Sequence, residues 1–280
     1  MIRRVFAVIG TVLLLSYVIT VGAECASPPA NMTAWWPADG TAEDLVGDND
    51  GTAIGATFVS GMVDQAFSFD GNDDYLSVPD DPSLRATSEI TFEFWVNFNT
   101  LPSGPFSSSL AICEKDNDYV LSWRADTQRL ELSFFDTLAS PGYRIGANIL
   151  LADITGVWHH IAITSANSVG QPTAEFHFYL DGVEEPNFPN VNSPSVLGGW
   201  NTGASGELYI GRRTQISSGE LYFDGIIDEL TIFDRMLDPS EIAEIHAAGS
   251  DGKCKGPLTG LIFEDGFETG DTTGWSATEQ

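Results

Sequence analysis

The chain has 280 residues, of which 42% are hydrophobic and 11% aromatic, so it can bury a sizeable core and is not an acidic disordered segment. Its 40 acidic residues against 12 lysines and arginines give a formal net charge of −28. A charge of that sign repels nucleic acids and anionic membranes and attracts cations, which excludes functions that depend on a basic surface.

The first 23 residues have the pattern of a secretory signal peptide. Arg3 and Arg4 form a short basic start, an apolar run follows, and Ala23 ends the small-residue stretch that a signal peptidase requires. We predict cleavage after Ala23, secretion to the outside or surface of the cell, and no membrane insertion afterwards. A lipidated Cys25 is the weaker alternative, because Glu24 precedes it where a small residue is expected. Cleavage of the signal peptide removes Arg3 and Arg4, so the mature chain has 10 basic residues against 40 acidic ones and a net charge of −30.

Three cysteines in an exported chain allow one disulfide and one remaining thiol. Cys25 precedes the first strand-like segment and Cys254 follows the last helix-like one, whereas Cys113 lies in an apolar stretch typical of a buried strand. We therefore predict a Cys25–Cys254 disulfide that joins the two ends of one domain, residues 24–254.

Short β segments separated by turn residues account for most of that domain. They are rich in aromatic and β-branched residues and bounded by Gly, Pro, Asn or Asp. The predicted strands include Gln65–Phe69, Asp74–Val78, Glu89–Phe98, Tyr119–Arg124, Arg129–Phe135, Tyr143–Leu150, Val157–Thr164, Ala174–Leu180, Glu207–Gly211 and Gly225–Phe233. One helix is predicted over Pro239–Ala248, with Asp238 as its N-cap and Gly249 after its last residue. Stretches 102–109 and 183–206 are predicted loops. The pattern predicts an all-β fold, an antiparallel two-sheet sandwich with one short late helix.

Alternation along three strands separates a face of apolar side chains, the dry face, from a face that mixes aromatic, polar and charged side chains, the mixed face. The dry faces carry Phe92, Phe94, Val96 and Phe98, then Ile161 and Ile163, then Phe176, Phe178 and Leu180. The mixed faces carry Glu93, Trp95, Trp158, His160, His177 and Tyr179. We expect the mixed face to be an open groove on a curved sheet.

Eight motifs follow one another along the domain. They are AWWPADGTAEDLVGDNDG (34–51), GMVDQAFSFDGNDDYLSVP (61–79), ITFEFWVNF (90–98), GVWHHIAIT (156–164), FYLDG (178–182), LYIGRR (208–213), FDGIIDELTIFDRMLDPSEIAEIHAAG (223–249) and GKC (252–254). This ordered set resembles the LamG-like jelly-roll domains of secreted bacterial proteins, within the concanavalin A-like lectin/glucanase superfamily. The resemblance implies a jelly-roll sandwich and extracellular recognition, and it implies no particular reaction. Residues 255–280 form a Gly/Asp/Thr-rich tail similar to a C-terminal motif of many secreted bacterial proteins.

The resemblance makes an extracellular glycan the predicted partner and a cell-surface protein the alternative. Trp95 is the candidate for stacking on a sugar ring. The other candidate ligand contacts on the mixed face are Glu93, Trp158, His177 and Tyr179. For the tryptophans and histidines the alternative is packing within the sandwich.

Catalysis is not predicted. Glycan-cleaving relatives place two carboxylates on one strand in the pattern Glu-x-Asp-x-x-Glu, and the segment Ile227–Leu230 lacks that spacing. Lyases of related folds need Tyr, His and Arg close together, and no arginine-bearing motif completes Tyr179 and His160.

A structural calcium ion is the predicted cofactor. Its preferred ligands are carboxylate, amide and carbonyl oxygens, and the resemblance implies an ion that ties the first loop to the last strand. The assigned ligands are Asp44, Asp48, Asn49 and Asp228. A second acidic cluster comprises Asp70, Asn72, Asp73 and Asp74. The alternative is that these residues are only turn formers and solvated charge.

Overall fold

The computed structural model describes residues 24–135, 144–150, 154–167, 175–186, 188–189, 200, 203, 205–214 and 220–256. The predicted signal peptide and almost all of the predicted tail lie outside these residues. Within the described ranges, no helix is long and apolar enough to cross a membrane.

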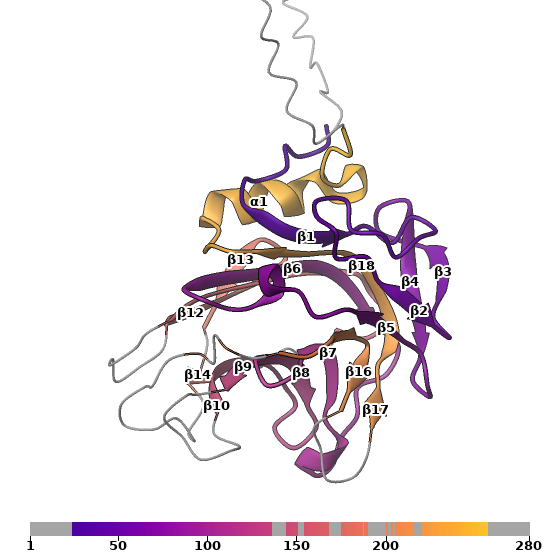
Figure 1. Ribbon diagram of the computed structural model, residues 1–280, viewed down its shortest axis with the longest axis vertical. Helices are drawn as coiled ribbons and strands as arrows, with labels where there is room; N and C mark the ends of the chain where they lie inside the picture. The colour runs from indigo at the N-terminus through magenta and orange to yellow at the C-terminus, as the bar shows by residue number, and fades with distance from the viewer. Residues whose placement is uncertain are drawn as a thin grey trace, which may run out of the picture.

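Two antiparallel sheets of eight strands each form a sandwich (Figure 1). The first sheet contains β1 (Met32–Trp36), β3 (Thr57–Ser60), β4 (Gln65–Asp70), β6 (Glu89–Phe98), β11 (His159–Ala166), β12 (Glu175–Leu180), β13 (Val183–Glu185) and β18 (Asp224–Phe233). The second contains β2 (Thr52–Ile54), β5 (Tyr75–Val78), β7 (Leu110–Lys115), β8 (Tyr119–Arg124), β9 (Arg129–Phe135), β10 (Arg144–Leu150), β14 (Phe188–Pro189) and β15 (Leu208–Ile210). A small ribbon pairs β16 (Arg212–Arg213) with β17 (Leu221–Tyr222). The helical elements are α1 (Pro239–Ala248) and the 3-10 turns η1 (Pro82–Leu84), η2 (Phe106–Ser108) and η3 (Gly249–Asp251).

Strands β6 and β18 lie at the centre of the first sheet, whose order is β13-β12-β11-β6-β18-β4-β3. Strand β4 pairs with the first half of β18 and β1 pairs with the second half. A bulge between Asp228 and Thr231 separates the two halves, and Glu229 has a φ of 57° there. The second sheet runs β14-β10-β9-β8-β7-β15-β5-β2, so both sheets join strands far apart in sequence, as a jelly roll does.

The dry faces predicted from alternation meet between the two sheets. On β6, Phe92, Phe94, Val96 and Phe98 are fully buried and belong to one core that also includes Trp123 of the second sheet. Each fully buried phenylalanine contributes roughly 1.5–3 kcal/mol of hydrophobic stabilisation. This core fixes the register of β6, because a slip of one residue would turn four apolar side chains out of it.

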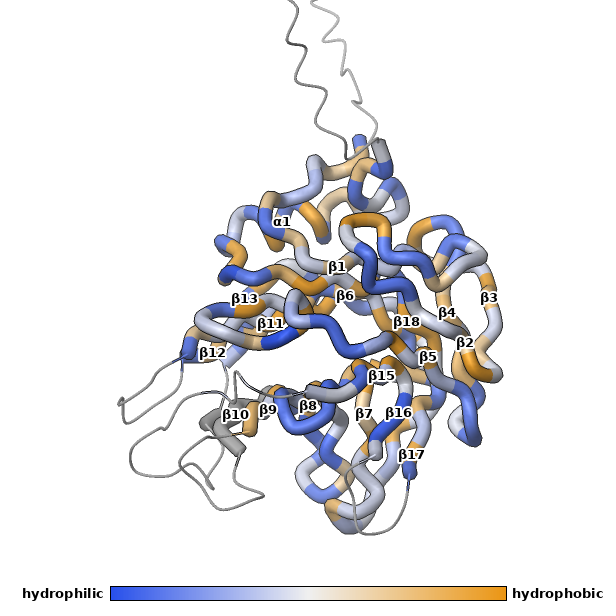
Figure 2. The backbone as a smooth tube through the Cα atoms, viewed as in Figure 1, coloured by the Kyte–Doolittle hydropathy of each residue, from blue (hydrophilic) through white to orange (hydrophobic). Residues whose placement is uncertain are grey.

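Helix α1 covers the outer face of the first sheet (Figure 1). It begins at Pro239 and ends at Ala248, as predicted, and hydrophilic and hydrophobic residues alternate along it in Figure 2. Its buried residues Ile242 and Ile245 pack against Ala162 of β11, with other side chains of the first sheet. The expectation of an open groove on this face is therefore wrong: the apolar side of the helix needs a surface to bury against, and the mixed face supplies it.

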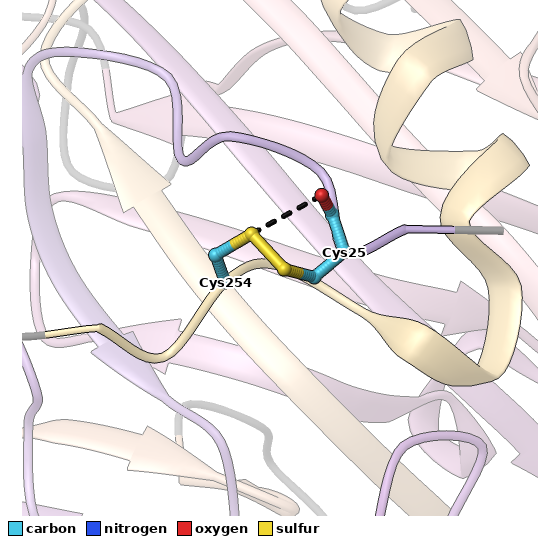
Figure 3. The surroundings of a disulfide bond; sticks show 2 residues. All are labelled: Cys25 and Cys254. Atoms are coloured by element: carbon cyan, nitrogen blue, oxygen red, sulfur yellow. Dashed lines mark hydrogen bonds between the residues drawn. A yellow bond between two sulfur atoms is a disulfide. The ribbon is translucent and has the colours of Figure 1, made fainter.

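A disulfide joins Cys25 to Cys254, which is the predicted pairing (Figure 3). The backbone N–H of Ala26 donates to the carbonyl of Gly252, and that of Cys254 donates to the carbonyl of Ala26, both at 2.8 Å. Cys113 is free and buried in β7. The two ends of the domain are thus held side by side.

Strands β13 and β14 fall inside a stretch that was predicted to be a loop. Strand β13 forms a hairpin with β12 through Asp181 and Gly182, whose φ angles are 50° and 76°. An Asp-Gly pair with two positive φ angles is the preferred two-residue hairpin turn, so the sequence carried a signal for this strand that the loop-like composition concealed.

Candidate functional site

Three of the five candidate ligand residues on the mixed face are covered. Glu93 is 0% exposed, Trp95 4% and Tyr179 3%. The ring of Trp95 packs against those of His160 and His246, with centroids 5.1 and 5.6 Å away. Because His246 belongs to α1, the helix occupies the space in which a sugar would have to stack. Trp95 is therefore a packing residue.

Glu93 belongs to a buried network of charges beneath the C-terminal segment. Its Oε1 lies 2.9 Å from Nε2 of His160, and its Oε2 accepts a hydrogen bond from Nζ of Lys253 at 2.9 Å. Lys253 also lies 3.2 Å from Oε2 of Glu229, to which the indole of Trp35 donates at 2.9 Å. Burial by itself raises the pKa of Glu93, but the charge of Lys253 and the hydrogen bond with His160 outweigh it and lower the pKa to about 2. This ionised carboxylate anchors the C-terminal segment to the sheet.

The remaining two candidates, Trp158 and His177, are partly exposed. Nδ1 of His177 lies 2.7 Å from Oε1 of Glu184. Burial lowers the pKa of His177, but Glu184 and Glu175 outweigh it and raise the pKa. Since Glu93, Trp95 and Tyr179 are buried, the five predicted ligand residues do not form one open site.

The predicted calcium ligands do not converge either. Oδ1 of Asp44 accepts hydrogen bonds from the backbone N–H groups of Trp35 and Val46, and Oδ2 accepts from the backbone and side chain of Asn49. These bonds hold the loop after β1 in its turn, and they occupy both oxygens of Asp44.

Asp228 is fully buried in β18, where its Oδ2 accepts from the backbone N–H of Val63 at 2.9 Å. Burial is the main reason that the pKa of Asp228 is raised to about 8, so without a cation beside it this carboxyl is mostly protonated at neutral pH. Among the described residues, no group of three acids that could share an ion includes Asp44, Asp48 or Asp228. Calcium binding by Asp44, Asp48, Asn49 and Asp228 therefore gains no support from this geometry and stays a prediction.

A pocket of about 530 Å³ lies where the turn after β4, the segment after β6 and the ribbon β16–β17 meet. We call it the rim pocket. The polar side chains that dominate its described lining are Asp70, Asn72, Thr100, Glu220, Tyr222 and Asp224.

Two carboxylates reach the rim pocket from neighbouring strands. Asp70 ends β4, Asp224 begins β18, and the two are paired in register. Gly71 has a φ of 77°, and a Cβ there would lie 2.9 Å from Cβ of Asp224, so only glycine allows the turn to pass this close. Thr100 and Asn99 donate hydrogen bonds to the two oxygens of Asp224, at 2.6 and 3.0 Å.

Tyr222 contributes the aromatic ring of the rim pocket. Its centroid lies 6.2 Å from that of Tyr75, which lies 6.1 Å from that of Tyr209. The guanidinium of Arg212 lies over the rings of Tyr75 and Tyr209 and forms an ion pair with Glu220. The hydroxyl of Tyr222 donates to Glu220 at 2.6 Å. The ring is therefore held in a fixed orientation by contacts within the protein.

The acidic cluster of the second loop adjoins the rim pocket and shares Asp70 with it. Ligand oxygens of Asp70, Asp73 and Asp74 all lie within 4.8 Å of one another. The side chain and the backbone N–H of Asn72 donate to Asp70 and lower its pKa, whereas burial and the charges of Asp70 and Asp73 raise the pKa of Asp74. Calcium takes about six to eight oxygen ligands, and these three carboxylates could supply part of such a set.

Sequence reasoning did not single out Thr100, Glu220, Tyr222 or Asp224. Asp70 and Asn72 were recognised only as part of the second acidic cluster. The pairing of β4 with β18 brings Asp70 to Asp224, and only the three-dimensional structure shows which strands pair. The glycine after Asp70, in a turn between two strands, was the one local signal available.

Solved structures with this fold include carbohydrate- and receptor-binding domains. Domain 4 of AbnA, a GH43 extracellular arabinanase from Geobacillus stearothermophilus, in complex with arabinotriose, is 19% identical, with a TM-score of 0.50 over 79% of this chain and 98% of that one. The botulinum neurotoxin type G receptor binding domain is 13% identical, with a TM-score of 0.52 over 78% of this chain and 51% of that one. A second structure of the serotype G binding domain is 14% identical, with a TM-score of 0.55 over 77% of this chain and 50% of that one. This chain thus spans about half the length of the neurotoxin domains, and at these identities the likeness shows the fold alone.

No curated protein sequence matches the chain. Residues 70–243, which are more than half of the chain and include most strands of both sheets, match the family described as the concanavalin A-like lectin/glucanases superfamily. The chain belongs to this family.

Proposed function

We propose that this protein is a secreted, non-catalytic recognition module that binds a glycan in the rim pocket. The observation that carries the proposal is the pairing of one pre-oriented aromatic ring, Tyr222, with several polar side chains around a single concave surface. The arabinotriose complex of the AbnA domain supports the idea that this fold can bind an oligosaccharide.

The chemistry of the rim pocket suits a sugar. Its volume of about 530 Å³ lies within the range of roughly 300–1,000 Å³ typical of small-molecule sites. A tyrosine ring offers its face to the C–H groups of a sugar ring, and carboxylates accept hydrogen bonds from hydroxyls. Since Tyr222 is already held by Tyr75 and Glu220, binding would order few side chains.

Two carboxylates of the rim pocket, Asp70 and Glu220, are poor proton donors, which supports a non-catalytic role. Hydrogen bonds from Asn72 lower the pKa of Asp70, and those from Tyr222 and Arg212 lower the pKa of Glu220. A glycosidase needs one carboxylic acid with a raised pKa beside its second carboxylate. We expect no release of reducing ends or unsaturated sugars from common β-glucans, xylan or alginate.

The test is a glycan array probed with the mature protein, followed by titration calorimetry with the best ligand. Tyr222→Ala should weaken binding about tenfold or more, because a tenfold change needs only about 1.4 kcal/mol. Tyr222→Phe keeps the ring and should retain most of the affinity. Trp158→Ala, at a partly exposed aromatic outside the pocket, is the matched control and should bind like the wild type.

Two results would contradict the proposal. One is the absence of any glycan ligand. The other is loss of binding in Trp158→Ala with wild-type affinity in Tyr222→Ala, which would return the site to the residues expected from the sequence. Capture of a cell-surface protein in place of glycans would favour the alternative of a protein-binding module.

We also propose that calcium stabilises the fold at the acidic cluster of Asp70, Asp73 and Asp74. An ion that binds only the folded state adds about 2.7 kcal/mol at a hundredfold excess over its Kd. Chelation should therefore lower the melting temperature by several degrees, and Asp73→Asn should remove that sensitivity while Asp48→Asn keeps it. Equal melting temperatures of the wild-type protein in chelator and in excess calcium would rule the ion out.

Export remains part of the proposal. The Cys25–Cys254 disulfide is typical of an oxidising compartment outside the cytosol. N-terminal sequencing of the protein recovered from culture medium should begin at Glu24, and an intact N-terminus in the cytosolic fraction would refute cleavage after Ala23.

A further inference from the structure

The rim pocket is rich in acceptors and poor in free donors. Three carboxylates line it, Asp70, Glu220 and Asp224, and none of the described lining residues is a lysine or an arginine. Among the described lining side chains, the hydroxyl of Ser108 is the only donor for which the structure gives no bond to a carboxylate.

The side-chain donors at the pocket already serve these carboxylates. Asn72 donates to Asp70, Thr100 donates to Asp224, and both Tyr222 and Arg212 donate to Glu220, so Glu220 is already paired with one positive charge. A carboxylate has about four acceptor positions on its two oxygens, so each one can accept further bonds from a ligand. A ligand group that needs donors, such as a carboxylate, a sulfate or an amide carbonyl, finds few of them here.

We propose that the rim pocket binds a sugar residue with a free, protonated amino group, an inference that rests on the proposed glycan-binding function. An ammonium group has three donors, no acceptor and a positive charge, which matches a pocket of acceptors and negative charge. Hydrogen bonds between an ammonium and a carboxylate are roughly twice as strong as neutral ones. N-acetylation removes that charge and adds a carbonyl acceptor.

The experiment compares three short β-1,4-linked oligosaccharides of equal length by calorimetry, with chelator present so that calcium does not occupy Asp70. They are built from glucosamine, from glucose and from N-acetylglucosamine. The glucosamine ligand should bind at least about tenfold more tightly than the N-acetylated one, with the glucose ligand between them. A uronic acid oligomer should not bind.

Two pocket variants locate the effect. Asp224→Asn and Glu220→Gln should each remove most of the preference for the amine. Glu244→Gln makes the same change of charge at an exposed position on α1, which contributes no residue to the pocket, and should keep the preference. Circular dichroism and melting temperature report whether each variant is folded.

The outcomes separate this inference from the proposed function. If the glucose and N-acetylated ligands bind as tightly as the amine and Tyr222→Ala abolishes binding, glycan recognition stands and the amine preference is overturned. If the preference persists in both pocket variants as it does in Glu244→Gln, it comes from the overall negative charge and the pocket assignment is overturned. If no oligosaccharide in this set binds while the glycan array finds another ligand, the amine preference is overturned and glycan recognition stands; only the absence of any ligand on the array overturns both.

Discussion

Replacement of Lys253 by methionine is the sharpest test of how the C-terminal segment is held on the sheet. The Lys253 side chain is 1% exposed, and its Nζ lies 2.9 Å from Oε2 of Glu93 and 3.2 Å from Oε2 of Glu229. Methionine keeps the length and the apolar stem but removes the charge. Glu93 then keeps only its contact with His160, and it remains fully buried.

The expected loss of stability follows from the Glu93 carboxylate, which is left buried without its lysine partner. Removing one partner of a buried ion pair typically destabilises a protein by about 3–5 kcal/mol. The lowering of the Glu93 pKa from 4.5 to about 2 corresponds to a stabilisation of its ionised form by roughly 3 kcal/mol, which agrees. For a domain of this size, that loss lowers the melting temperature on the order of 10 °C.

Urea unfolding followed by circular dichroism, with the disulfide intact, measures the difference in unfolding free energy. Because the folded-state pKa of Glu93 is depressed, its stabilisation in the wild type is complete above pH 4.5 and is lost as the pH falls towards 2. Loss of Lys253 leaves burial to raise that pKa. The gap between Lys253→Met and wild type should therefore be largest near neutral pH and shrink below pH 4.5.

Lys255→Met is the matched control. Its side chain is 23% exposed and pairs with Asp39 at 2.6 Å and with Glu229 at 3.0 Å. Partly exposed pairs contribute about 1 kcal/mol or less, so this variant should lose much less stability. A loss below about 1 kcal/mol in Lys253→Met, or a loss that stays constant from pH 7 to pH 3, would refute the reasoning.

Three further predictions concern the ends, the core and the pocket. The Cys25–Cys254 disulfide closes a loop with a sequence separation of 229, so chain entropy predicts that replacing both cysteines by alanine lowers the free energy of unfolding by about 5 kcal/mol at most. Peptide mapping under non-reducing conditions should find this disulfide and no other. Burial raises the pKa of Asp118 from 3.8 to about 7, so the folded state binds the carboxyl proton more tightly than the unfolded state does. The free energy of unfolding should therefore fall as the pH rises between those two values. In urea titrations at several pH values, Asp118→Asn should show a smaller fall. Gly71 has a φ of 77°, and Gly71→Ala would place a Cβ against Asp224, so this variant should have a lower melting temperature and a weaker glycan affinity. Wild-type values for both would show that the turn can shift.

The elements of the fold are largely local, and the sequence determined them. Strand β6, the 10-residue run Glu89–Phe98, was predicted at its observed bounds, because its alternation has a period of two and a one-residue slip would expose four core side chains. Helix α1 was also predicted at its bounds, since Asp238, Pro239 and Gly249 mark its ends chemically. The disulfide followed from the same order along the chain.

The candidate site is not local, and only the tertiary structure decided it. Alternation shows which side chains share a face of a sheet, but it does not show what packs over that face. Helix α1 packs on Trp95, and Lys253 of the C-terminal segment lies on Glu93. Asp70 and Asp224 are neighbours because β4 pairs with β18 across a large sequence separation. Charge and composition predicted an acidic surface, but hydrogen bonds within the protein decide which of its oxygens can still accept a bond from a ligand.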